Sequence, residues 1–283
     1  MLIWAAPGDW SPVFWGKQMP EVEDRDVQLY YELSGARGGR VLMFSNSLGS
    51  NLHMWDKVVP RFEANCHVLR YDMRGHGKSS VPAGPYTIDQ LGGDVLFLLD
   101  RLGIERVDLC GLSVGGMIAM WIAIHAPERL GRLILANTAA RIGTREGWEQ
   151  RIATVETAGM ASLAAASLER WFTRGYREEH PDEMGAMRDM IAAVDANGYK
   201  AGCAVLRDTD LRGEIAGISA PALVITGKHD PATPPSDGLA LHAALRDSKY
   251  VELDASHISA WERADEFAEA VHSFLINGER ADG

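Results

Sequence analysis

Short runs of apolar residues recur along most of the chain, and longer stretches with helical spacing separate them. In residues 27–35 apolar and polar positions alternate, which predicts an edge strand closed by Gly35. More compact apolar runs predict further strands at 40–45, 67–72, 107–111, 133–137, 221–226 and 250–253. The intervening spacing predicts helices at 87–102, 114–126 and 266–275, and Thr87 with Gln90 forms a capping-box pattern at the start of the first of these. Strands that alternate with helices in this way predict a parallel sheet with right-handed crossovers.

This alternation stops in the middle of the chain. Between about 139 and 218 no comparable strand pattern occurs, and segments such as 160–171 and 183–194 have helical spacing. We therefore expect an all-helical cap inserted into an α/β core, above the sheet edge where ligands bind in open α/β folds. The expected division is 1–18 N-terminal extension, 19–138 first part of the core, 139–218 cap, and 219–283 second part of the core.

One short motif lies between a predicted strand and a predicted helix, the position in which a serine can act as a nucleophile. Gly111-Leu112-Ser113-Val114-Gly115 follows a predicted strand and precedes a predicted helix, which is the setting of a G-x-S-x-G nucleophile elbow. A serine in such a turn projects its hydroxyl clear of the strand ends, and the flanking glycines let the backbone close tightly. Ser113 is the candidate nucleophile.

A serine hydroxyl needs a base, and the base needs a carboxylate that fixes its tautomer. Behind an elbow of this kind the expected order along the chain is serine, acid, histidine. Asp230 follows the strand predicted at 221–226, and His257 lies on a loop after the last predicted strand. We predict that His257 is the general base and Asp230 its orienting carboxylate. Asp254 is the rival acid, and His76 is expected to brace a turn.

An acyl-transfer site also needs donors for the developing oxyanion. The amide of Val114, at the start of the predicted helix, is the first candidate. The second donor is expected in the loop after the strand at 40–45, where the Ser47 amide is our candidate. A purely structural turn is the alternative for that loop.

Composition narrows the class of protein. The chain has 283 residues, 46% hydrophobic residues and a formal net charge of −11, which suit a globular protein and argue against nucleic acid or anionic membrane as a partner. Three scattered cysteines show no metal-ligand spacing and fit a reducing cytoplasm. Residues 1–18 have no basic start, and Pro7 and Gly8 interrupt their apolar run, so we expect neither a signal peptide nor a membrane span there.

Taken together, these motifs resemble the α/β-hydrolase fold family and, within it, the 3-oxoadipate enol-lactonases. The similarity runs from about residue 19 to residue 275. The segments that carry it are 45–49 with 53–56, 111–118, 135–143 with Trp148, 203–212 and 255–259. The elbow and the acid–base pattern are common to the superfamily, whereas Asn-Thr-Ala-Ala-Arg at 137–141 and Leu-Arg-Asp-Thr-Asp-Leu-Arg at 206–212 are the specific segments.

The resemblance implies opening of 3-oxoadipate enol-lactone to 3-oxoadipate, with no cofactor and no metal, in bacterial breakdown of protocatechuate or catechol. That substrate is a small carboxylated lactone, which a protein of charge −11 must attract locally. Arg141, just beyond the strand at 133–137, is the candidate carboxylate ligand because its guanidinium binds carboxylates in a bidentate way, and a solvated surface arginine is the alternative. Trp148 and Trp171 are candidate pocket residues, with simple packing as their alternative.

Other functions use the same residues. A carboxylesterase, a C–C bond hydrolase or a perhydrolase shares the machinery, and a non-catalytic ligand receptor shares the scaffold. Dehalogenase and epoxide-hydrolase chemistry needs a carboxylate at the elbow, which Ser113 does not supply. The sequence leaves the oligomeric state open, with a homo-oligomer among the alternatives.

Overall fold

The fold is built on one twisted sheet, seen in a computed structural model that describes residues 21–24 and 26–277. The expected extension at 1–18 lies outside the described residues. The strands are β1 (Glu21–Asp24), β2 (Val27–Gly35), β3 (Val41–Ser45), β4 (His67–Tyr71), β5 (Val107–Leu112), β6 (Leu130–Ala136), β7 (Ala222–Gly227) and β8 (Ser248–Leu253). Their spatial order is β1-β2-β4-β3-β5-β6-β7-β8. From β4 to β8 neighbouring strands pair in parallel, which confirms the predicted sheet.

The edge of the sheet differs from the prediction. β2 pairs antiparallel with β4 on one side and with β1 on the other, so β1 is the edge strand. The sequence of β1 is Glu-Val-Glu-Asp, which is too short and too charged to show an apolar alternation. Charge of this kind is common on edge strands because it discourages pairing with other chains.

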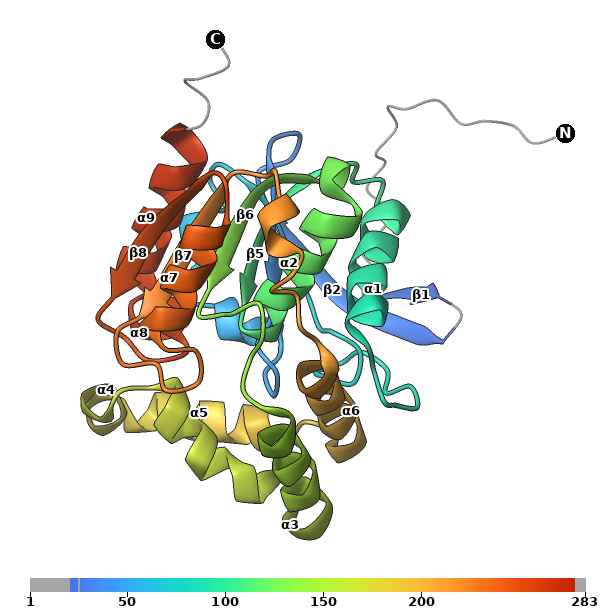
Figure 1. The fold of residues 1–283 in the computed structure, drawn as a ribbon, viewed down its shortest axis with the longest axis vertical. Coiled ribbons are helices and arrows are strands. Elements are labelled where there is room, and N and C mark those ends of the chain that lie inside the picture. Colours follow the sequence, from blue (N-terminus) through green and yellow to red (C-terminus); the bar gives the residue numbers. More distant parts are fainter. Residues whose placement is uncertain (1–20, 25, 278–283) are drawn as a thin grey trace, which may run out of the picture.

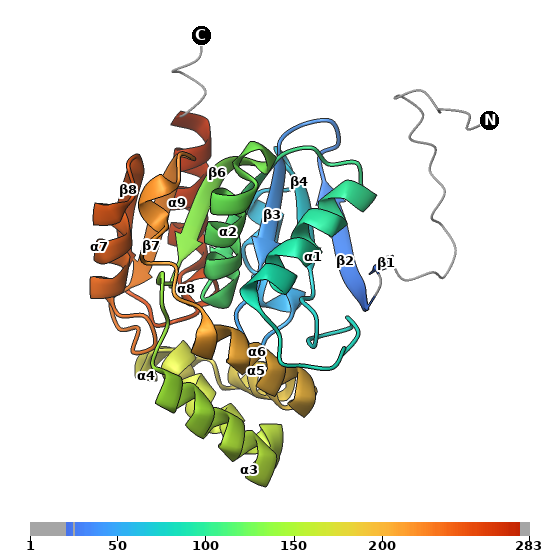
Figure 2. The same cartoon turned by 45° about the vertical axis from the view of Figure 1, so that its right-hand side comes forward.

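Helices cover both faces of the sheet (Figures 1 and 2). α1 (Ile88–Arg101), α2 (Val114–His125) and α7 (Pro235–Ala244) lie on one face, and α8 (Ser259–Glu262) and α9 (Ala264–Asn277) lie on the other. The capping box predicted at Thr87 and Gln90 is present at the start of α1. Short 3₁₀ turns occur at Leu52–Trp55, Val59–Arg61, Pro127–Arg129 and Ile215–Gly217.

The regular secondary structure between β6 and β7 consists of helices. It contains α3 (Arg145–Trp171), α4 (Arg174–Glu179), α5 (Pro181–Ala192) and α6 (Ala196–Asp208). Figures 1 and 2 show these helices gathered beyond the carboxyl ends of the parallel strands. The predicted helix at 160–171 falls within α3, and the one at 183–194 overlaps α5. We keep 139–218 as the proposed extent of the cap.

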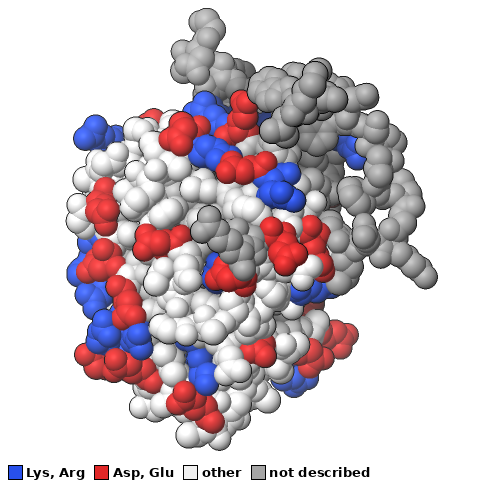
Figure 3. All heavy atoms as spheres, turned by 90° about the vertical axis from the view of Figure 1, so that its right-hand side faces the viewer, with Lys and Arg blue, Asp and Glu red and all other residues white. Residues whose placement is uncertain are grey.

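On the face shown in Figure 3, acidic and basic side chains are interspersed and are not sorted into one patch. Among the described residues, no helix has both the length and the apolar character needed to cross a bilayer.

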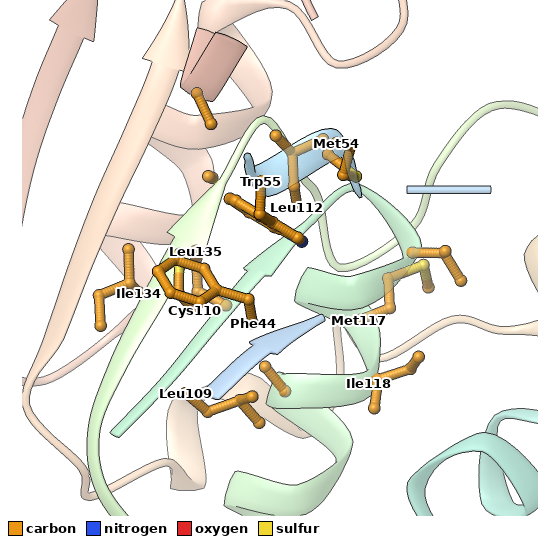
Figure 4. Close-up of a cluster of buried hydrophobic side chains, with 14 of the residues drawn as sticks. Phe44, Met54, Trp55, Leu109, Cys110, Leu112, Met117, Ile118, Ile134 and Leu135 are labelled. Atoms are coloured by element: carbon orange, nitrogen blue, oxygen red, sulfur yellow. The ribbon is translucent and has the colours of Figure 1, made fainter. Parts of the chain in front are cut away.

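The centre of the core lies directly beneath the elbow. Phe44 of β3, Leu109 of β5 and Leu135 of β6 are fully buried, and Trp55 packs against Phe44 with ring centroids 4.7 Å apart (Figure 4). Burial of each such side chain stabilises the fold by roughly 1.5–3 kcal/mol. Ser113 follows β5, which pairs with β3 on one side and with β6 on the other, so this core fixes the position of the candidate nucleophile.

Candidate active site

Ser113 occupies a strained turn between β5 and α2. Its backbone has φ 59° and ψ −120°, a left-handed conformation that a serine adopts only when its surroundings impose it. The neighbouring glycines allow the close packing that does so. A Cβ at Gly111 would lie 2.1 Å from the Gly115 carbonyl oxygen, and one at Gly115 would lie 2.2 Å from the Ser45 carbonyl oxygen. The structure therefore has the backbone of a nucleophile elbow at the predicted residue.

Asp230 and His257 meet although they lie 27 residues apart. Nδ1 of His257 lies 2.8 Å from Oδ2 of Asp230, and the two residues are 3% and 3% exposed. Asp230 follows β7 and His257 follows β8, so both loops leave the sheet at the same edge as the elbow. With an ionised carboxylate at Nδ1, that nitrogen carries the proton and Nε2 remains a base.

A group of polar neighbours keeps Asp230 ionised. Asn137 Nδ2 donates to Oδ2 at 3.0 Å, and Thr233 Oγ1 donates to the same oxygen at 2.7 Å. Burial by itself would raise the pKa of Asp230, but His257 and these hydrogen bonds bring it below the ordinary value. The sequence analysis placed Asn137 in the family-specific segment 137–141 but gave neither Asn137 nor Thr233 a role in the site. The other signals were a polar residue at the end of a predicted strand and a threonine three residues beyond the acid.

The rival acid lies elsewhere. Asp254 contacts His229, with Oδ1 and Nε2 2.8 Å apart, and both side chains are largely exposed. Asp254 is therefore engaged outside the cavity, while Asp230 contacts His257 directly.

The structure corrects the oxyanion prediction for Ser47. The Ser47 amide donates to Met54 Sδ at 3.3 Å, so it is already used within its own loop. Within residues 26–277, the amides of Leu48 and Val114 donate no hydrogen bond. Leu48 also lines the cavity that contains Ser113. The available donor of this loop is thus one residue further along the chain, because the chain turns at Gly49, where φ is 83°.

His76 braces this loop, in line with its expected role in a turn. Its Nε2 accepts a hydrogen bond from the Gly49 amide at 3.1 Å, and its Nδ1 lies 3.2 Å from the Arg74 carbonyl oxygen. This arrangement requires a neutral ring with its proton on Nδ1. Burial lowers the pKa of His76 to about 4, which keeps the ring neutral.

A cavity of about 270 Å³ joins the elbow to the helical segment. Ser113, His257 and Leu48 line it from the core, and Trp148 and Trp171 line it from α3. A volume at the small end of the range for ligand sites suits a small substrate. Both tryptophans thus stand where the sequence analysis expected them, and their role in substrate binding stays a prediction.

Arg141 does not line this cavity. Its guanidinium pairs with Asp210 at 3.3 Å, and its side chain is 39% exposed. The prediction that Arg141 binds the substrate carboxylate is therefore wrong in its placement: the residue follows the right strand, but its side chain turns outward to an acidic partner. Two other arginines line the cavity, Arg151 and Arg170.

A second hollow, of about 410 Å³, lies at the amino ends of the parallel strands. Arg40, Arg106, Arg132 and Asp108 line it, and within residues 21–24 and 26–277 no serine, cysteine, threonine or histidine does. Ligands of open α/β sheets bind at the carboxyl ends instead, so the candidate active site is the cavity at Ser113.

The sheet order, the elbow and the Asp230–His257 contact define the α/β-hydrolase class. Residues 40–264 match the family model of the alpha/beta hydrolase fold. The chain is 42% identical to 3-oxoadipate enol-lactonase 2 of Acinetobacter baylyi, over 89% of this chain and 94% of that protein. It is 35% identical to 3-oxoadipate enol-lactonase 1 of the same organism, over 87% and 92%.

A solved structure agrees with these relatives. The enol-lactonase from Burkholderia xenovorans superposes with a TM-score of 0.89 and 46% identity, covering 90% of this chain and 99% of that one. The chain belongs to the α/β-hydrolase fold family and, within it, to the family of the 3-oxoadipate enol-lactonases.

Proposed function

We propose that the chain is a serine hydrolase that opens 3-oxoadipate enol-lactone to 3-oxoadipate through an acyl-enzyme. The observation that carries this proposal is the buried contact between Asp230 and His257 on the cavity that also contains Ser113. The names of the enol-lactonase relatives, at 42% and 35% identity, support the substrate.

In the first half of the reaction, Nε2 of His257 removes the proton of the Ser113 hydroxyl while its Oγ attacks the lactone carbonyl carbon. The carbonyl oxygen becomes an oxyanion, and the free amides of Leu48 and Val114 are its proposed donors. The bond from the carbonyl carbon to the enol oxygen then breaks. His257 returns the proton to that oxygen, and the released enol becomes a ketone.

In the second half, water replaces the leaving group. His257 accepts a proton from the water as its oxygen attacks the acyl-enzyme carbonyl, and the same two amides hold the second oxyanion. The bond to Ser113 Oγ breaks, the serine regains its proton from His257, and the new carboxylic acid leaves and loses its remaining proton to water. Asp230 keeps the proton on Nδ1 throughout and stabilises the transient imidazolium.

The same resemblance supports a place in bacterial catabolism of protocatechuate or catechol. We place the reaction in the cytoplasm, because Cys66, Cys110 and Cys203 are buried and form no disulfide with one another, as a reducing compartment favours.

The test is the loss of ultraviolet absorbance from enzymatically generated 3-oxoadipate enol-lactone. Ser113→Ala removes the nucleophile, and we expect kcat/KM to fall by about 10⁴-fold or more with an unchanged melting curve. Ser219→Ala, at an exposed position that does not line the cavity, is the matched control and keeps full activity. Rapid hydrolysis of simple aryl esters with none of the lactone would instead make the chain an esterase.

A further inference from the structure

Two arginines give the wall of the active-site cavity a positive charge. Arg151 and Arg170 line it together with Ser113 and His257, and among the residues that the structure describes no aspartate or glutamate does. This composition runs against the formal charge of −11 on the whole chain. A locally positive cavity in an acidic protein concentrates anions.

Neither guanidinium has an acidic partner within the described part of the chain. Arg151 donates from Nη1 to the Tyr199 hydroxyl at 3.3 Å, and its guanidinium lies 5.2 Å from the Trp148 ring centroid. Arg170 donates from Nη2 to Ser167 Oγ at 3.1 Å. A guanidinium has five N–H donors, so most of those on both side chains remain free for a ligand.

Two of the groups beside the arginines, Tyr199 and Cys203, are neutral. Burial raises the pKa of Tyr199 to about 12 and that of Cys203 to about 12, so neither supplies a negative charge at neutral pH. Burial, and after it the charge of Arg151, lowers the pKa of Arg170, and the smaller opposing influence of Glu169 does not offset them. Elsewhere around the cap segment, by contrast, Arg141 and Arg145 pair with Asp210 and Asp208.

The backbone conformation of α3 brings Arg151 and Arg170 to the same cavity. They lie 19 positions apart on α3, which in a straight helix would separate them by about 28 Å. A kink at Gly159, where φ is 71° and ψ 175°, breaks α3 into two segments. Arg151, before the kink, and Arg170, after it, both line the cavity. Figure 1 shows the course of the helix.

Arg170 is also fixed to the loop of the general base. Ser256 Oγ donates to the Arg170 carbonyl oxygen at 2.8 Å, and the Ile258 amide donates to the Trp171 carbonyl oxygen at 3.0 Å. These hydrogen bonds flank His257 on both sides. The distance between the Arg170 backbone and the catalytic imidazole is therefore set by the fold.

We propose that Arg151 and Arg170 form a carboxylate-binding site that selects acyl substrates bearing a free carboxylate a few bonds from the reacting carbonyl. This deepens the proposed function, on which it rests for the identity of the substrate, since 3-oxoadipate enol-lactone carries one such arm. The arginines hold the arm while Ser113 attacks the ring carbonyl. A neutral ester leaves two partly buried cations without an anionic partner and binds less well.

The experiment compares two lactones with the same ring. One is 3-oxoadipate enol-lactone, and the other is α-angelica lactone, in which a methyl group replaces the carboxymethyl arm. We expect Arg170→Gln and Arg151→Gln each to lower kcat/KM for the carboxylated lactone on the order of 30-fold, mainly through KM, and to change that for the neutral lactone less than about threefold. Arg170→Lys should recover part of the loss. Arg141→Gln, whose partner lies outside the cavity, is the matched control and keeps the wild-type ratio.

The outcomes separate this inference from the proposed function. If Ser113→Ala abolishes turnover of the carboxylated lactone but both arginine variants keep the wild-type preference, the carboxylate site is wrong and the lactonase stands. If the wild type does not open 3-oxoadipate enol-lactone, the proposed function fails. The site is then tested with 4-nitrophenyl hydrogen glutarate against 4-nitrophenyl butyrate, and an arginine-dependent preference for the charged ester upholds it, whereas its absence overturns it.

Discussion

At the scale of single residues, the site depends on hydrogen bonds between side chains that are far apart in the sequence. Asn137, with φ 44°, donates to Asp230 at 3.0 Å and to the Ser256 carbonyl oxygen at 3.2 Å, so it ties the acid to the loop of the base. It also accepts a hydrogen bond from Ser259. Asn137 is thereby a positioning residue, whose contribution acts through Asp230 and His257.

A second residue-scale feature makes stability depend on pH. The pKa of His76 is about 4 in the folded chain, below its ordinary value of 6.5, because burial disfavours the charged ring. Between pH 4 and pH 6.5 this histidine is therefore protonated in the unfolded chain but neutral in the folded chain. Its contribution to folding stability is fully present above about pH 6.5 and is lost as the pH falls toward 4. We expect this single group to cost about 2 kcal/mol of unfolding free energy at pH 5 relative to pH 7.

The measurement is urea unfolding of the wild type and His76→Gln at both pH values. Glutamine can still accept from the Gly49 amide but does not titrate. The difference in unfolding free energy between the two proteins should therefore shrink by about 2 kcal/mol at pH 5. An equal difference at both pH values would contradict a neutral buried His76.

At the scale of elements, the kink in α3 links backbone conformation to substrate choice. The combination of φ 71° and ψ 175° at Gly159 lies in a region that only glycine occupies readily. A Cβ there would meet no atom within 4 Å, so a substitution is opposed by backbone strain and not by a clash.

We expect Gly159→Ala to destabilise the fold by about 1–3 kcal/mol and to raise KM for the carboxylated lactone more than for α-angelica lactone. The reason is that a straighter α3 moves Arg151 and Arg170 apart. Gly185→Ala in α5 is the matched control: its Cβ has only an ordinary contact at 3.8 Å, and it should stabilise the helix by about 0.5–1 kcal/mol. Equal KM changes for both lactones would show that the kink does not contribute to carboxylate binding.

At the scale of the whole molecule, a partly buried polar cluster joins the cap segment to the core. Glu183 of α5 accepts hydrogen bonds from Lys57 and from Trp261, each at 2.7 Å, and from Tyr176 at 2.6 Å. Partial burial would raise the pKa of Glu183, but Lys57 and the hydrogen bonds hold it at about 2. Its contribution to stability is therefore complete above about pH 4.5 and is lost as the pH falls toward 2.

Glu183→Gln should lower the unfolding free energy by about 1 kcal/mol at pH 7 and the melting temperature by about 2 °C, because one charge and its hydrogen bonds are weakened. Thermal unfolding followed by circular dichroism measures this. Glu178→Gln breaks an exposed pair with Arg174 within α4 and should change stability by less than about 0.5 kcal/mol. A loss no larger than that of Glu178→Gln would show that the cluster does not hold the two parts together.

The sequence by itself determined the features that depend on short-range patterns. The alternation of strands and helices follows from apolar spacing within about ten residues, and the elbow at Ser113 follows from the glycines that its turn requires. Asp230 and His257 could be singled out because each follows a strand whose carboxyl end faces the same edge. Local spacing did not reveal β1 as the edge strand, because Glu-Val-Glu-Asp has no apolar alternation.

Only the tertiary structure decided which groups face the cavity. The direction of an amide depends on how its loop packs, so the use of the Ser47 N–H by Met54 could not be deduced from a motif. Likewise, Arg141 turns to Asp210, while Arg151 and Arg170, far apart along α3, reach one cavity because the helix bends between them. Sequence spacing fixes which face of a straight helix a side chain takes, but a single bend and a distant partner determine where that side chain points.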